Sequence, residues 1–143
     1  MPTSSATQQA NVDLVAGLGP LTGPGFSSPN RALFADDFVF HVANPGLPEL
    51  AGDHHGVDGF VRLFGQLRSA VDRELQSVAH SLTPYGDERV GAFATHTLSF
   101  GGGAIEVDAI VVWRVVDGRF AEAWDIPAVN TVRPVGQDAE SKV

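Results

Sequence analysis

The sequence predicts an α+β domain, in which helices lie on one face of a strongly curved antiparallel sheet and close it around an apolar cone. Two patterns carry this prediction. Apolar residues recur at helical spacing in the first half of the chain, and long segments with the alternation of strands follow one another over residues 75–126. Because the helical segments precede the strands, the helices can gather on one face of the sheet.

The composition indicates one folded domain without cysteine chemistry. A chain of 143 residues with 43% hydrophobic and 18% charged residues is long and apolar enough to bury one core. It contains no cysteine, which excludes disulfides, thiolate metal sites and a cysteine nucleophile. Any chemistry therefore falls to histidine and carboxylate side chains.

The charge of the chain argues against two kinds of partner. The formal net charge is -8, which repels phosphate backbones and anionic lipid surfaces, so neither nucleic acid nor a membrane is an expected partner. The N-terminal MPTSSATQQA lacks the basic and apolar regions of a signal peptide, and no apolar run is long enough to span a bilayer. A cytoplasmic location is the resulting expectation.

The N-terminal segments are short and rich in turn residues. Residues 1–10 are small and polar and are expected to form a disordered leader, before a single domain over residues 11–130 and a tail over residues 131–143. NVDLVAGL (11–18) is a short helix candidate. The prolines and glycines of GPLTGPGFSSPN (19–30) predict a loop.

The middle of the chain adds one short helix, one strand and one long helix. Ser28 or Asn30 can cap a short helix running into RALFADD, and DDFVFHVAN predicts a strand, followed by a loop to about Gly56. Asp58 can cap the helix GFVRLFGQLRSAV, whose apolar residues recur every three or four positions.

The second half predicts a meander of four strands. The segments are LQSVAHSLTPY, RVGAFATHTLSF, AIEVDAIVVWRVV and GRFAEAWDI. Three glycines at 101–103 predict one turn, and Asp117 with Gly118 is a good hairpin signal. Consecutive strands joined by tight turns pair antiparallel.

The order of three segments resembles a known superfamily. FADDFVFHV, LAGDHHGVDGFVRLFGQL and VVWRVVDGRFAEAWDIP resemble the NTF2-like superfamily, specifically its SnoaL-like polyketide cyclase and ketosteroid-isomerase-like branch, over about Leu33 to Pro127. The resemblance implies a cystatin-like cone with an apolar pocket. The sequence departs from the family at its start, where a short helix and a Gly/Pro-rich stretch replace the usual long first helix.

The resemblance also implies where an acid/base residue lies. Ketosteroid isomerases carry a general-base aspartate on the first strand, and the ungapped match of FADDFVFHV puts Val42 at that place, which disfavours steroid isomerisation by that mechanism. SnoaL-like cyclases are similar in carrying their acid/base aspartate on the last strand, where EAWD offers Asp125.

Strand alternation gives an independent argument for Asp125. Residues two apart share a face, so Asp125 lies with Ala121 and Ala123, whereas Phe120 and Trp124 lie on the other face. Two alanines beside an acid leave room for a ligand. An apolar surrounding would raise the pKa of Asp125 and suit it to acid/base work near neutral pH. The structural alternative is a strand-end residue that accepts hydrogen bonds from the following backbone.

Three further residues are catalytic candidates. Asp108 could be a second pocket acid that pairs with Asp125, or a solvated acid near a strand end. His96 lies on an apolar strand face, where a hydrogen-bonded core histidine is the alternative. His41 ends FVFHV and could shuttle a proton or orient a carbonyl.

Aromatic residues supply the candidate substrate-binding surface. The chain has more of them than one small core requires, so some are expected to line a pocket for a flat hydrophobic ligand, with core packing as the alternative. The ligand contacts expected are Phe40, Phe64, Tyr85, Trp124 and His55.

No metal or cofactor is expected. His54 and His55 are adjacent in a loop, a spacing that seldom brings two ligands to one ion, and they are better explained as organising the turn before a helix. His80 is expected at the surface. The chain has no GxSxG elbow for a serine nucleophile and no phosphate-binding loop.

The leading hypothesis is a cofactor-independent enzyme that cyclises or isomerises a polyketide-like or polycyclic hydrophobic substrate by acid/base catalysis. Asp125 would move the proton, and His96, His41 or Tyr85 would hold the oxyanion. One alternative is an epoxide hydrolase of the limonene-epoxide-hydrolase kind. Another is a non-catalytic module that binds a small molecule or a partner. By the resemblance, the chain is expected to form a homodimer through the outer face of the sheet.

Overall fold

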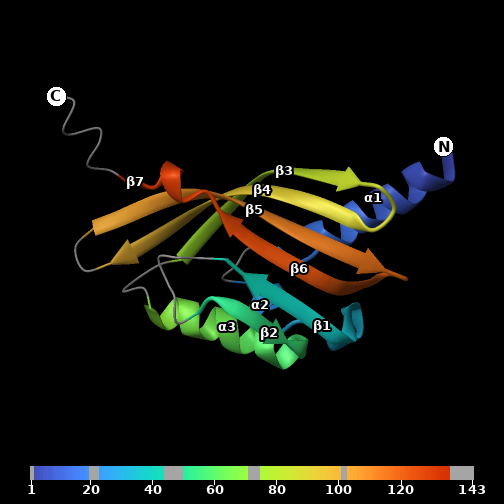
Figure 1. The fold of residues 1–143 in the computed structure, drawn as a ribbon, viewed down its shortest axis with the longest axis horizontal. Helices are drawn as coiled ribbons and strands as arrows, with labels where there is room; N and C mark the ends of the chain where they lie inside the picture. Colours follow the sequence, from blue (N-terminus) through green and yellow to red (C-terminus); the bar gives the residue numbers. More distant parts are fainter. Residues whose placement is uncertain (1, 20–22, 44–49, 71–74, 101–102, 136–143) are drawn as a thin grey trace.

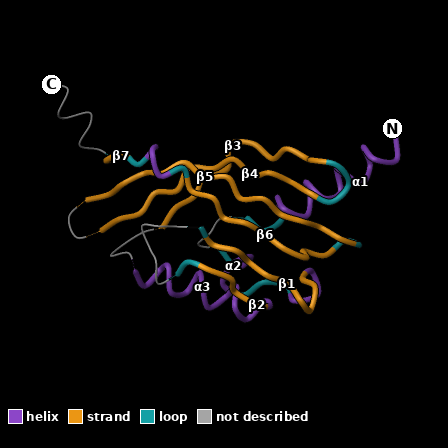
Figure 2. Tube along the Cα trace, in the orientation of Figure 1, coloured by secondary structure: helices purple, strands orange, loops and turns teal. Residues whose placement is uncertain are grey.

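The computed structural model describes residues 2–19, 23–43, 50–70, 75–100 and 103–135 and has an α+β architecture (Figure 1). Seven strands form one curled, unclosed sheet in the order β2-β1-β6-β5-β4-β3, with β7 paired to β5. Helix α3 lies along β1 and β2, and α1 lies beside β3 and β4 (Figure 2). The predicted fold class is confirmed.

The predicted meander forms the larger part of the sheet. It consists of β3 (Leu75–Tyr85), β4 (Arg89–Phe100), β5 (Gly103–Val116) and β6 (Arg119–Pro127), each antiparallel to the next. Asp117 and Gly118 turn from β5 to β6 with positive φ angles of 53° and 76°, the backbone that a tight hairpin needs.

The prediction of a wholly antiparallel sheet is wrong at the first strand. β1 (Phe34–Val42) joins the free edge of the meander and pairs parallel with β6. β2 (Gly52–His55) pairs antiparallel with β1, in a segment that the sequence assigns to a loop. A two-residue strand, β7 (Arg133–Pro134), begins inside the expected tail.

Helix α3 (Gly56–Ala70) confirms the expected helix and turns its apolar side to the sheet, but it begins before Asp58. Asp58 lies in the first turn, where it pairs with Arg31, and is therefore not the cap. Two shorter helical elements precede it, α2 (Pro24–Ser27) and the 3-10 turn η1 (Arg31–Leu33), which Asn30 caps by accepting a hydrogen bond from the Ala32 backbone N–H. Another 3-10 turn, η2 (Val129–Thr131), follows β6. Of the expected loops and tail, residues 20–22, 44–49, 101–102 and 136–143 lie outside the described residues.

The expected disordered leader is wrong for residues 2–10, which belong to helix α1 (Pro2–Ala16). Tertiary hydrogen bonds hold this polar helix against the β3–β4 turn. The buried Asn11 donates from Nδ2 to the Asp87 carbonyl oxygen at 2.8 Å, and Gln8 donates to the Gly86 carbonyl at 3.2 Å. The first helix is therefore long, and the expectation that a short helix replaces it is wrong.

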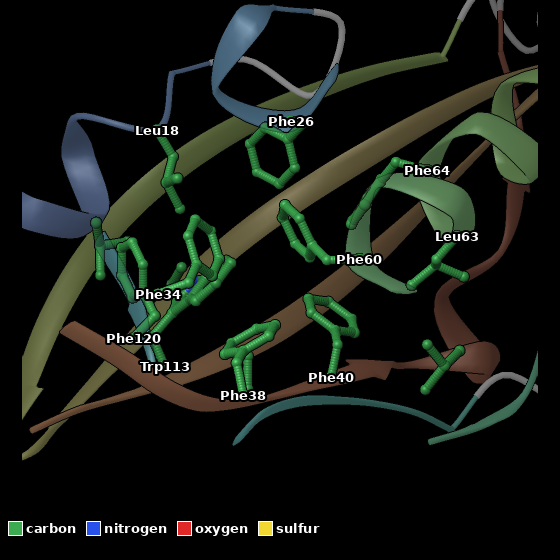
Figure 3. Packing of buried hydrophobic residues seen from close by; sticks show 14 of the residues in the cluster. Leu18, Phe26, Phe34, Phe38, Phe40, Phe60, Leu63, Phe64, Trp113 and Phe120 are labelled. Atoms are coloured by element: carbon green, nitrogen blue, oxygen red, sulfur yellow. The ribbon is translucent and has the colours of Figure 1, made fainter. Parts of the chain in front are cut away.

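The core is a cluster of aromatic rings centred on Phe60 of α3. The Phe60 side chain is fully buried, and its ring lies within 6.2 Å, centroid to centroid, of six other aromatic rings. Figure 3 shows these rings converging from α2, β1, α3 and β5. The partners are Phe26, Phe34, Phe38, Phe40, Phe64 and Trp113.

One glycine is required by close packing between helices. A Cβ atom on Gly25 of α2 would lie 1.9 Å from the Leu18 carbonyl oxygen, which is far inside van der Waals contact. Only glycine lets α2 approach the end of the first helical segment this closely. Among the described residues, no helix is long and apolar enough to cross a membrane.

Candidate active site

A cavity of about 540 Å³ lies between the concave face of the sheet and the helices. Its walls are mainly apolar and come from α1, α2, α3 and five strands. This size and lining are typical of small-molecule sites. The apolar wall residues include Val15, Leu18, Phe26, Phe40, Phe64, Leu67, Leu82, Ala92, Val111 and Trp113.

Asp125 lies in the wall of this cavity near the end of β6. Its cross-strand neighbours are Val42 on β1 and Val111 on β5, so the carboxyl group is set between apolar side chains. Asp125 Oδ1 is buried and has no hydrogen-bond partner among the described residues. Burial raises the pKa of Asp125 from 3.8 to about 6.

His96 also lines the cavity, on β4. Its Nδ1 lies 2.9 Å from Ser77 Oγ, on the residue directly opposite in β3. Burial lowers the pKa of His96, so the ring is neutral at pH 7. In the register of the sheet, Asp125 on β6 pairs with Val111 on β5, and Val111 pairs with Ala92 on β4. Ala92 is four residues from His96 along β4.

His41 and Trp124 lie on the opposite, outer face of the sheet, which corrects their assignment to the pocket. The two rings stack at a centroid distance of 5.4 Å. His41 Nδ1 lies 2.7 Å from Asp53 Oδ1, and its Nε2 lies 2.6 Å from Glu122 Oε2. Burial opposes the charged ring, but the bonds to the two carboxylates outweigh it and raise the pKa of His41.

Alternation along β1 explains this placement. Phe38, Phe40 and Val42 are buried on the concave side, so His41 must point the other way. Both nitrogens of the His41 ring are occupied by carboxylates, and the ring does not line the cavity.

Asp108 also lies on the outer face, so it does not pair with Asp125. Arg133 donates from a terminal guanidinium nitrogen to Asp108 Oδ1 at 3.1 Å, and Thr95 Oγ1 donates to the same oxygen at 3.0 Å. The hydrogen bond from Arg133 is the main cause of the lowered pKa of Asp108. The residue of β5 opposite Asp125 is Val111, three positions away, and an odd separation puts Asp108 on the other face.

The expected substrate contacts divide between the cavity and the surface. Phe40 and Phe64 line the cavity and are also part of the aromatic core. Tyr85, at the end of β3, is 66% exposed and is not part of the cavity wall. His55 is exposed on β2 and is also outside the wall.

Two features of the cavity were not predicted. Ser77 becomes a partner of His96 only through the pairing of β3 with β4, which the spacing of residues along the chain does not specify. His80, expected at the surface, is exposed but contributes to the cavity rim at an irregularity of β3, and its Nε2 lies 2.7 Å from Thr95 Oγ1. At the irregularity, four consecutive residues of β3, Ala79 to Leu82, line the cavity.

The described residues contain no group of three or more histidine or carboxylate side chains placed to hold a metal ion. In the segment before α3, His54 Nε2 lies 2.7 Å from the Leu50 carbonyl oxygen, while Asp53 bonds to His41. His54 therefore stabilises the local turn.

The comparisons with known proteins identify a family and a fold. A SnoaL-like domain matches residues 30–123. No curated protein matches the sequence. The structure of Bal32a, from a soil-derived mobile gene cassette, is similar with a TM-score of 0.72 at 20% identity, covering 85% of this chain and 92% of that one.

Two further structures support the same fold. TerC, co-crystallised with polyporic acid, has a TM-score of 0.68 at 16% identity, covering 85% of this chain and 93% of that one. An NTF2-like protein from Burkholderia thailandensis has a TM-score of 0.69 at 17% identity, covering 87% of this chain and 92% of that one. Likenesses at these identities show an NTF2-like fold, and function has to be argued from the cavity.

Proposed function

Because this chain belongs to the SnoaL-like domain family, we propose that it is a cofactor-independent enzyme that cyclises or isomerises a polyketide-like or polycyclic hydrophobic substrate. The apolar cavity of about 540 Å³ supports this substrate class, since it offers large aromatic and aliphatic surfaces to a ligand. TerC, a protein of the same fold, was crystallised with polyporic acid, which is consistent with a ligand of this kind.

The single observation that carries the proposal is the state of the Asp125 carboxyl group. A buried carboxylate oxygen without a hydrogen bond is costly and rare, and it calls for an explanation. A catalytic role supplies one, because an acid with a pKa of about 6 can both accept and return a proton near neutral pH. A substrate group beside Oδ1 would satisfy the missing bond.

The proposed step is an intramolecular aldol closure that needs no co-reactant. The Asp125 carboxylate removes a proton alpha to a carbonyl group, and the carbon–hydrogen electron pair forms the new carbon–carbon bond to a second carbonyl carbon of the same substrate. The π electrons of that second carbonyl move to its oxygen, and the alkoxide takes the proton back from Asp125. Isomerisation uses the same two proton transfers at different carbons.

The test combines binding with turnover. Anthraquinone-like ketones, steroids and hydrophobic epoxides are screened by thermal shift against the wild type and Asp125→Asn, since a ligand of the folded state raises its melting temperature. Ligands that bind are then assayed for conversion. Asp125→Asn should lose at least 100-fold in rate, the order typical of a general acid/base, while Asp108→Asn, an acid on the outer face, should retain activity. Equal rates in the wild type and Asp125→Asn would refute the role of Asp125.

The two alternative functions make different demands on the cavity. Epoxide hydrolysis of this kind would need a second acid and an arginine beside Asp125, but Asp108 binds Arg133 and Arg114 binds Glu122, both on the outer face. That arrangement removes the support for a hydrolase. A non-catalytic binding module would bind a screened ligand with unchanged affinity in Asp125→Asn and convert none.

We also propose a homodimer formed through the outer face of the sheet. Phe93, Ile110 and Ile126 lie in one row across β4, β5 and β6 and are 38%, 36% and 47% exposed. A row of exposed apolar residues on a sheet face favours association. Light scattering should give a dimer mass for the wild type and a monomer mass for Ile110→Glu; a wild-type monomer would contradict the proposal.

A further inference from the structure

Besides Asp125, and besides His80 and Ser81 at the irregularity of β3, the described cavity wall has one polar group, the pair formed by His96 and Ser77. This pair has no part in the proton transfer at Asp125. The two residues face each other on β4 and β3, and both line the cavity. His96 Nδ1 and Ser77 Oγ are 2.9 Å apart, so this hydrogen bond fixes the ring. The Nε2 atom makes no hydrogen bond with the described residues that would compete with a ligand.

The pair is separated from Asp125 along both directions of the sheet. Asp125 and His96 are two strands apart, which corresponds to about 10 Å, and four residues out of line, which corresponds to about 13 Å. A base and an oxyanion donor for one enolate each need to lie within about 3 Å of neighbouring substrate atoms. His96 is too far along the cavity for that arrangement.

The chemistry of the pair favours a neutral oxygen group. A serine hydroxyl both donates and accepts, so Ser77 can bond either tautomer of His96. Nε2 can accordingly donate to a carbonyl group or accept from a hydroxyl group. Burial lowers the pKa of His96 and keeps the ring uncharged, which leaves it without the charge that would attract a carboxylate.

The rest of the cavity wall points to the same ligand class. No lysine or arginine is among the described residues that line it, so an anionic ligand would find no counter-charge there. Between Asp125 and His96 the wall is formed by small and apolar residues, Ala92, Ala94, Val107 and Val111. A ligand that reaches both polar points must therefore be long, uncharged and apolar in its middle.

We propose that the His96–Ser77 pair binds a neutral carbonyl or hydroxyl group at the end of the ligand remote from Asp125, which makes the substrate class an extended apolar molecule with two separated oxygen functions. This inference rests on the proposed function for the identity of the reacting end. It assigns His96 to substrate selection and not to the stabilisation of the oxyanion.

The experiment compares two steroids that differ in one terminal oxygen. Estrone carries a ketone at one end and a phenol at the other, and 3-deoxyestrone lacks the phenol. Titration calorimetry should show about tenfold tighter binding of estrone by the wild type, the effect of one hydrogen bond to a buried polar group. His96→Leu and Ser77→Ala should reduce this ratio toward one, whereas His55→Leu, the same change at an exposed histidine outside the cavity, should preserve it.

A second readout locates the contact and guards against indirect effects of the substitutions. The Nε2 resonance of His96 in a nitrogen-15 spectrum should shift with estrone and shift less with 3-deoxyestrone. Equal affinity of the wild type for both steroids, or a tenfold ratio that survives in His96→Leu, would overturn the inference. So would the failure of both steroids to bind.

The outcomes separate this inference from the proposed function. Asp125→Asn should keep the preference for estrone, because the phenol is bound by the His96–Ser77 pair. If the steroid preference depends on His96 but no ligand is converted by the wild type, the proposed enzyme activity fails and the inference about His96 stands. If turnover depends on Asp125 and the steroid preference is absent, only the inference fails.

Discussion

Replacing Asp125 with asparagine should make the protein more stable at neutral pH while removing the acid/base group. The folded-state pKa of Asp125 is raised from 3.8 to about 6 by burial, so the folded protein holds the proton more tightly than the unfolded chain. Protonated Asp125 therefore costs the folded state little. The ionised form destabilises it, and this penalty grows as the pH rises from about 4 through 6.

The size of the effect follows from the two pKa values. A pKa of about 6 against 3.8 corresponds to about 3 kcal/mol at pH 8, when the carboxyl group is ionised in both states. Asparagine has a similar shape and carries no charge, so Asp125→Asn should recover most of this free energy. For a domain of this size the melting temperature should rise by roughly 8 °C at pH 8.

Urea unfolding followed by tryptophan fluorescence at pH 4 and pH 8 measures the difference between the variant and the wild type. Taking the difference cancels the groups that both proteins share. Asp125→Asn should be more stable at pH 8 and nearly equal to the wild type at pH 4. Asp108→Asn should behave oppositely, because the pKa of Asp108 is lowered by Arg133 and its contribution is lost as the pH falls. A difference for Asp125→Asn that does not change with pH would refute the reasoning.

Four further substitutions test the packing and the outer face. Phe60→Ala should cost about 3–5 kcal/mol in urea unfolding, and a loss below 1 kcal/mol would mean that its ring cluster is not the core. Gly25→Ala should lower the melting temperature because its Cβ would collide with the Leu18 carbonyl, whereas Gly65→Ala in α3, where a Cβ meets nothing within 4 Å, should raise it slightly. His41→Gln should be less stable than the wild type at pH 5, and the difference should shrink as the pH rises through the raised pKa of His41; a constant difference would contradict the ion-pair account.

Local periodicity was sufficient for the meander, for α3 and for the face of β6 that carries Asp125. In β6 the alternation holds from Glu122 to Asp125 but fails at Phe120, which was expected on the face of Trp124. A register shift between Arg114 and Val115 of β5 turns Phe120 into the core together with Ala123. The same reasoning could have placed His41 outside the cavity, since Phe38 and Phe40 on the other face of β1 are the larger apolar residues.

Features that depend on contacts between distant segments could not be predicted in this way. The polar N-terminal helix is held by hydrogen bonds to the β3–β4 turn, more than seventy residues away along the chain. The pairing of Ser77 with His96 and of Asp108 with Arg133 likewise depends on strand register and on the return of the chain after β6. In both cases the residues can be read from the sequence, but their hydrogen-bond partners are determined by the tertiary fold.

The most direct test of the proposed role of Asp125 is an NMR titration of its side-chain carboxyl carbon, with Asp125→Asn used to identify the signal. The structure predicts a midpoint near pH 6 in the free protein, because the carboxyl group is buried among apolar side chains. A hydrophobic ligand that fills the cavity and displaces water should raise the midpoint further. A midpoint close to 3.8, unchanged by such a ligand, would show that Asp125 is solvated and would contradict its assignment as the acid/base group of the cavity.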